Sequence, residues 1–210
     1  MLMAASGTPR RARLSRAQQR AARTRDILDA AWAIYREQGY EAATIEAVAE
    51  HAGISRMPVY SLFGDKQNLY YELSNMLLGQ LVQVMVEPLH SAPSLRAGLE
   101  RMARLAATPQ PRTSGHGPES LFHVVQVIGL SRPDIAARQK KGAKDVVDAF
   151  AAAIRKAPLQ RGERLRASPE IVASLIVSLI NGLSNVETQT GRKFIRASDL
   201  AAMFCAAAFR

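Results

Sequence analysis

The segment 44–66, TIEAVAEHAGISRMPVYSLFGDK, places one glycine between two short stretches of helical pattern. Gly53 can adopt the left-handed backbone conformation that a sharp turn between helices requires. Thr44 and Ser55 are favourable N-cap residues for the helices on either side of that turn. Two short helices joined in this way are the arrangement of a helix-turn-helix reader of DNA, although ordinary helical hairpins share it.

Helical signals extend over the whole chain, and we find no convincing segment of strand alternation and no internal repeat. We therefore predict an all-α fold of about nine helices. Expected N-caps are Ser15, Asp65, Ser168 and the pair Ser198-Asp199, and Pro88 is expected to lie beyond the end of the fourth helix. The expected helices span about 16–38, 45–52, 56–62, 66–86, 94–107, 118–130, 133–156, 169–189 and 199–210.

The net charge of +10 and the pI of about 10.3 indicate an anionic partner, either nucleic acid or a membrane surface. A single cysteine, Cys205, excludes an intrachain disulfide and fits a reducing compartment. No apolar run approaches the roughly 20 residues that span a bilayer. The N-terminus lacks the apolar segment of a secretory signal, although its arginines would also fit an organelle transit peptide. We expect a cytoplasmic protein.

The helix after Ser55 has an inward and an outward face. Val59 and Phe63 are four residues apart and should pack in the core. The outward set is Arg56, Met57, Pro58, Tyr60 and Ser61. Arg56 could form two hydrogen bonds with a guanine edge, Tyr60 could donate to a phosphate, and Met57 with the adjacent proline could touch a thymine methyl group. Alternatively, Met57 and Tyr60 pack on a neighbouring helix.

Other residues around the turn have capping or phosphate-binding potential. Pro58 lacks an N–H, so we predict that Ser55 caps the N–H of Met57 and that the helix survives. Lys66 begins the next helix, where a lysine can reach a phosphate. Thr44 is placed in the same way and can also cap its own helix.

The N-terminal arm carries seven arginines before the first acidic residue, Asp26. Cations in the first turn of a helix are unfavourable for that helix, which favours an external anion near Arg16. Such an arm suits phosphate tracking or insertion into the minor groove, although it could also be a passive tail. The predicted DNA-contacting arginines of the arm are Arg10, Arg11, Arg13 and Arg16.

Residues 25–70 resemble the DNA-binding domain of the TetR (tetracycline repressor) family. The resemblance covers under a quarter of the chain. Met57-Pro58 stands where the family often has a glycine and a small polar residue, and Leu62 stands where histidine or tyrosine is usual. The base preference of the family therefore does not carry over to this chain, and a phosphate contact at 62 is lost. The matching positions are Ile27-Leu28, Ala30-Ala31, Tyr35, Gly39-Tyr40, Thr44, Val48-Ala49, Ala52-Gly53-Ile54-Ser55, Tyr60, Phe63, Lys66 and Leu69.

The resemblance implies a transcriptional regulator, most simply a repressor that binds a palindromic operator in double-stranded DNA as a homodimer and is released by a small-molecule effector. It implies no enzymatic activity and no cofactor or metal. The expected domains are a basic arm (1–20), a three-helix helix-turn-helix domain (21–68) and a helical domain for ligand binding and dimerisation (69–210).

In the family the last two helices form the dimer interface. Small residues at every fourth position of the helix 169–189 would let a partner helix approach closely, although a monomer core could produce the same pattern. Cys205 is expected to act there as a small apolar residue. The predicted interface residues are Ser174, Leu175, Ser178, Leu179, Gly182, Val186, Leu200, Met203, Phe204 and Ala207.

The family also implies a ligand pocket in the second domain. Its expected lining is Met102, Phe122, His123, Gln126, Phe150 and Asn181. Two alternatives stay open. His116, Glu119 and His123 have a spacing that could hold zinc in an all-α metal sensor or enzyme, although Gly117-Pro118 separates His116 from the helix. The charge alone would also suit a membrane-surface protein or a non-specific nucleic-acid binder.

Overall fold

The computed structural model describes residues 15–107, 125, 127–192 and 195–210, and this part of the chain is built from helices. An isolated bridge between Leu165 and Phe209 is its one element of β pairing. A further helical segment covers 127–131. The predicted all-α fold is confirmed. The helices are α1 (Arg16–Ala42), α2 (Ile45–His51), α3 (Arg56–Phe63), α4 (Lys66–Ser91), α5 (Leu95–Ala107), α7 (Pro133–Lys156), α8 (Pro169–Thr190) and α9 (Ala197–Ala208).

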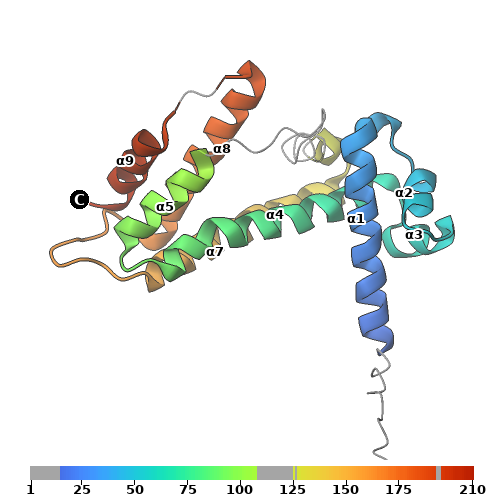
Figure 1. Ribbon diagram of the computed structural model, residues 1–210, viewed down its shortest axis with the longest axis horizontal. Coiled ribbons are helices and arrows are strands. Elements are labelled where there is room, and N and C mark those ends of the chain that lie inside the picture. Colours follow the sequence, from blue (N-terminus) through green and yellow to red (C-terminus); the bar gives the residue numbers. More distant parts are fainter. Residues whose placement is uncertain (1–14, 108–124, 126, 193–194) are drawn as a thin grey trace, which may run out of the picture.

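Two large hydrophobic cores organise these helices, and a smaller cluster contains Tyr71, Val125, Ile128 and Ile135. Helices α1, α2 and α3 gather around the start of the long helix α4, while α5, α8 and α9 lie towards the other end of α4 (Figure 1). Ile27, Val48, Val59 and Leu69 have no exposed surface and lie in the first core. The second core joins the later part of α4 to α5, α7, α8 and α9, and Met102 lies fully buried within it.

Four of the predicted helix starts are confirmed by their caps. Ser15 and Gln18 form both bonds of a capping box. The Thr44 hydroxyl accepts a bond from the Ala47 N–H at 3.1 Å. Asp65 accepts one from the Asn68 N–H at 2.7 Å, and Ser168 caps α8. These caps are local in sequence, and each satisfies an N–H that the helix leaves free.

The predicted end of the first helix at Gly39 is confirmed as a break in conformation. Gly39 has φ +77°, and the helical assignment resumes briefly afterwards to Ala42. The kink lets Tyr40 turn back towards Tyr70, whose ring centroid lies 5.0 Å away.

The predicted end of α4 before Pro88 is wrong, because the helix continues through Pro88 to Ser91. Val86 and Leu89, on either side of the proline, are buried in the second core. A Cβ added to Gly98 of α5 would meet the carbonyl oxygen of Pro88 at 3.0 Å, so the two backbones approach closely here. Burial and packing therefore offset the one helical hydrogen bond that proline removes.

Two other predicted caps are wrong. Ser55 occupies the N-cap position of α3, but its side chain makes no capping hydrogen bond. Helix α9 begins at Ala197 with Arg196 as its N-cap, rather than with the predicted pair Ser198-Asp199. The carboxylate of Asp199 instead accepts bonds from Arg196 Nε and Nη2, at 2.8 and 3.1 Å, so an ion pair takes the place of a cap.

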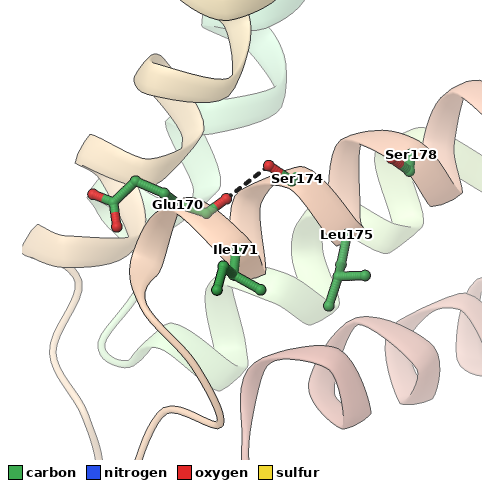
Figure 2. Close-up of a pocket in the computed structure, with 5 residues that line it drawn as sticks. All are labelled: Glu170, Ile171, Ser174, Leu175 and Ser178. Carbon is green, nitrogen blue, oxygen red and sulfur yellow. Dashed lines mark hydrogen bonds between the residues drawn. The ribbon is translucent and has the colours of Figure 1, made fainter.

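Helix α8 is more apolar than its interruptions by serine, asparagine and glycine led us to expect. The stretch Pro169–Glu187 has a mean hydropathy of 1.4, enough by length and composition to cross a membrane, so the prediction that no such run exists is wrong. The core helices of soluble proteins can have the same length and composition, so one such helix is weak support for a membrane span. Few of its residues are buried within the chain. Ile171 and Leu175 project from the same side of the helix beside a shallow surface depression (Figure 2).

Candidate nucleic-acid interface

The turn between α2 and α3 is closed by backbone hydrogen bonds. Gly53 has φ +66°, as its position in the sequence predicts. Its N–H donates to the carbonyl of Glu50, and the N–H of Ile54 donates to the carbonyl of Ala49, both at 3.0 Å. A left-handed residue bridging the last carbonyls of a helix is the usual way to end it sharply. The turn therefore holds α3 at a fixed angle to α2.

Helix α3 has the two faces that its sequence predicts. Val59 is fully buried and Phe63 is 7% exposed, both in the first core. On the opposite face Met57 is 68% exposed and Tyr60 is 40% exposed, and Arg56 and Ser61 are also exposed. Pro58 lies half-buried at the side, and the helix survives it. A helix with buried anchors and an exposed arginine, methionine and tyrosine can present those side chains to a groove of DNA.

A carboxylate that the sequence reasoning missed lies beside this exposed face. Glu46, in the first turn of α2, accepts a hydrogen bond at Oε1 from the Tyr60 hydroxyl at 3.4 Å. The same oxygen lies 3.7 Å from Nη1 of Arg56. In the sequence, Glu46 looks like an acidic residue stabilising a helix start, and nothing there indicates contacts across the turn.

Lys66, at the start of α4, has partners within the protein. Its ammonium donates to the carbonyl of Glu41 at 3.1 Å and lies 4.5 Å from the centroid of the Tyr40 ring. Burial, followed by the nearby carboxylates of Glu41 and Asp65, raises the pKa of Tyr40, so its ring stays neutral beneath the lysine. An ammonium has three donors, so these contacts leave donors available for a phosphate.

Three of the predicted DNA-binding residues come together in one place. Thr44, Tyr60 and Lys66 all line a shallow depression between the end of α1, α2, α3 and the start of α4. Glu46 lines the same depression. Arg16 is exposed at the start of α1, at the far end of that helix from α2, while Arg10, Arg11 and Arg13 lie outside the described residues. The DNA contacts themselves stay predictions.

The predicted ligand-pocket residues are not gathered around a described cavity. Met102 and Phe150 are buried in the second core, whereas Asn181 is exposed on α8. Phe122, His123 and Gln126 lie outside the described residues, as do His116 and Glu119 of the possible zinc set. Among the residues that the structure describes, no cluster of three metal-ligating side chains occurs. The pocket lining stays a prediction.

The predicted dimer residues fall into three groups by burial. Leu200 and Phe204 of α9 are buried within the chain's own core, where they cannot also face a partner. Leu179 and Ala207 are half-buried. The remaining predicted residues are exposed and are Ser174, Leu175, Ser178, Gly182, Val186 and Met203.

These helices, with their buried anchors, glycine turn and exposed second helix, define a helix-turn-helix DNA-binding domain within an all-helical chain. Residues 27–73 match the model of the bacterial regulatory proteins of the tetR family. Within the chain, the sequence that is specific to this family therefore lies in the helix-turn-helix domain.

A curated relative and two solved structures illustrate the similarity. The HTH-type transcriptional repressor AcnR of Corynebacterium glutamicum is 36% identical over 62 residues, which are 30% of this chain and 33% of AcnR. The match therefore spans about a third of the length of that relative. A Mesorhizobium loti protein described as a TetR-family transcriptional regulator superimposes with a TM-score of 0.69 at 21% identity, over 94% of this chain and 100% of that one. A transcriptional regulator from Saccharomonospora viridis, solved in complex with choline, gives a TM-score of 0.63 at 19% identity, over 90% and 99% of the two chains.

Proposed function

We propose that this protein is a DNA-binding transcriptional regulator, most simply a repressor, and not an enzyme. The observation that carries the proposal is the exposed face of α3. Met57 and Tyr60 lie open beside Arg56, while Val59 and Phe63 anchor the helix from behind. Arg56 would bind a guanine edge in the major groove, and Met57 with Pro58 would contact a thymine methyl group.

Phosphate contacts would fix this helix in register on the duplex. Thr44, Ser61, Tyr60 and Lys66 are the proposed phosphate-binding residues around α3, and Ser55 lies at its start. The basic arm, proposed as residues 1–20, would add Arg10, Arg11, Arg13 and Arg16. Contacts of this kind supply affinity that does not depend on sequence, and they make binding sensitive to salt.

A dimer of the chain would read a palindrome. The exposed apolar face of α8, with Leu175, Val186 and the closely approachable Gly182, is the proposed contact between copies, together with Met203 of α9. Two α3 helices related by a two-fold axis would enter successive major grooves about 34–36 Å apart. In the proposed division at residues 68–69, residues 21–68 bind DNA and residues 69–210 bind the effector and form the dimer.

The second domain, 69–210, is the proposed site of a small-molecule effector. The choline complex of the Saccharomonospora regulator is the observation that favours this role among proteins of similar fold. Such an effector would release the operator only if it bound the DNA-free state more tightly than the DNA-bound state. The proposed lining combines the buried Met102 and Phe150 with Phe122, His123, Gln126 and Asn181. A DNA regulator of this kind works in the cytoplasm, at the nucleoid.

Selection of duplexes from a random pool tests the proposal. The purified full-length chain should enrich a palindrome, and a nuclease footprint on the enriched duplex should cover both half-sites. Sedimentation of the complex should give two chains for each duplex. Enrichment of no common sequence, with equal affinity for all duplexes, would instead favour a charge-driven binder without a reading function.

A further inference from the structure

The contacts of Glu46 bear on the specificity of DNA binding, and the inference drawn from them rests on the proposed function. Tyr60 and Arg56 are two polar side chains on the exposed face of α3, and both approach Oε1 of Glu46, at 3.4 and 3.7 Å. The carboxylate comes from α2, so it crosses the turn to reach both of them. Its side chain is 53% exposed and that of Arg56 is 66% exposed. All three groups are therefore open to an incoming duplex.

An acidic side chain on a surface that binds phosphates weakens binding to DNA of any sequence. Phosphates repel the carboxylate directly, and any phosphate that takes Arg56 away from Glu46 must also break the ion pair. Binding to a guanine edge does not require the ion pair between Arg56 and Glu46 to break. The guanidinium has five donors in a fixed fork, so it can hold Glu46 with one nitrogen and bind O6 and N7 with others.

We propose that Glu46 is a specificity-determining residue: it positions Arg56 for base contact, holds the Tyr60 hydroxyl beside it, and penalises the use of Arg56 as a general phosphate ligand. Glu46 orients Arg56 before DNA arrives, which reduces the rotamer freedom lost when the arginine binds a base. On a duplex without the correct base, the ion pair between Glu46 and Arg56 lowers the affinity. Its contribution therefore lies in the ratio of specific to non-specific binding.

The chain provides a matched control on the same short helix. Glu50 is also exposed on α2, one turn further on, and its replacement changes the net charge by the same amount. Glu46→Gln and Glu50→Gln should be compared with the unaltered full-length chain. The two probes are the duplex that the unaltered chain selects from a random pool and a shuffled duplex of the same length and composition.

Glu46→Gln should strengthen binding to the shuffled duplex by about two- to fivefold, the scale of an exposed ion pair, and should lower the specific-to-shuffled ratio by a similar factor. On the shuffled duplex, the slope of log affinity against log salt should steepen by up to about 0.9, because Arg56 gains a phosphate. Glu50→Gln should leave the ratio unchanged. In an Arg56→Gln background, Glu46→Gln should lose most of its effect on the ratio.

An unchanged ratio in Glu46→Gln, with the selected duplex still preferred, would overturn the role of Glu46 while the proposed function stands. An equal fall of the ratio in Glu50→Gln would overturn it as well, since general charge would then explain the result. An unaltered chain that selects no sequence at all would remove the proposed function and the inference with it. Far-UV circular dichroism of each variant should match that of the unaltered chain, so a change in ratio reports on contacts and not on folding.

Discussion

Arg132, immediately before α7, donates a hydrogen bond from Nη1 to Oδ2 of Asp65, the N-cap of α4, at 3.1 Å. Asp65 precedes Lys66 and caps the helix that connects the two cores. The same Nη1 donates to Gln67, and the Nε and Nη2 atoms of Arg132 bind the carboxylate of Asp134 at 3.0 Å. One guanidinium thus ties the region before α7 to the residue that fixes the start of α4.

Replacing Arg132 with glutamine should destabilise the chain in a way that depends on pH. Hydrogen bonds from Arg132 lower the pKa of Asp134 below its ordinary value of 3.8. A lowered pKa contributes stability above pH 3.8, and this contribution is lost as the pH falls through the folded-state pKa. Urea unfolding at pH 7 and at lower pH should show a smaller acid-induced loss in Arg132→Gln than in the unaltered chain. If the free energy of unfolding changed with pH by the same amount in both proteins, the role of the Arg132–Asp134 pair would be contradicted.

Phe63 and Met57 lie on opposite faces of α3, so substitutions at these two positions should separate effects on stability from effects on DNA binding. Phe63→Ala removes a side chain that is 7% exposed and should lower the free energy of unfolding by about 3–5 kcal/mol. Met57→Ala removes one that is 68% exposed and should change it by less than about 0.5 kcal/mol, while weakening binding to the selected duplex. Urea titration and fluorescence anisotropy measure the two quantities. A strongly destabilised Met57→Ala would mean that Met57 packs within the protein.

Tyr70 is 1% exposed, and its hydroxyl has no hydrogen-bond partner in the described structure. Tyr70→Phe should therefore raise the free energy of unfolding by about 1 kcal/mol, because it removes an unsatisfied buried polar group. Burial raises the pKa of Tyr70 above its ordinary value of 10.0. The raised pKa contributes stability below pH 10, and this contribution is lost as the pH rises further. Tyr70→Phe should therefore also reduce the fall in the free energy of unfolding at alkaline pH. Tyr60→Phe, on the exposed face of α3, is the control. A less stable Tyr70→Phe would reveal a partner for the hydroxyl.

Gly182 tests the proposed dimer surface on α8. A Cβ at Gly182 meets nothing within 4 Å in the single chain, so Gly182→Ala should stabilise the helix by up to about 1 kcal/mol in a monomer. In a dimer that needs close approach at this residue, the added methyl group should weaken association. Analytical ultracentrifugation over a range of concentrations measures the dimer dissociation constant. An unchanged constant would place the contact elsewhere on the chain.

Local signals in the sequence predicted much of the fold correctly. The caps of Ser15, Thr44 and Asp65 and the positive φ of Gly53 each depend on residues within one or two turns. The alternation of buried and exposed residues on α3 follows from helical periodicity alone. For that reason the helix-turn-helix and its exposed face follow from the sequence alone.

Features that depend on distant packing could not be predicted in this way. The passage of α4 through Pro88 follows from the burial of Leu89 against helices that come later in the chain. Arg132 and Asp65 are separated by 67 residues, and the acceptor role of Glu46 depends on how α2 and α3 cross. Ser55 failed as a side-chain cap although its residue type favours that role, since backbone position alone leaves the hydroxyl free to turn away.

Methylation protection of guanine N7 on the selected duplex tests most directly whether α3 reads the major groove, where N7 is exposed. The exposed face of α3 predicts two protected patches on one side of the duplex, with centres about 10–10.5 base pairs apart. It also predicts that Arg56→Ala removes protection at one guanine in each half-site while the phosphate footprint persists. Guanine N7 atoms that stay fully reactive throughout a stable complex would contradict major-groove reading by α3.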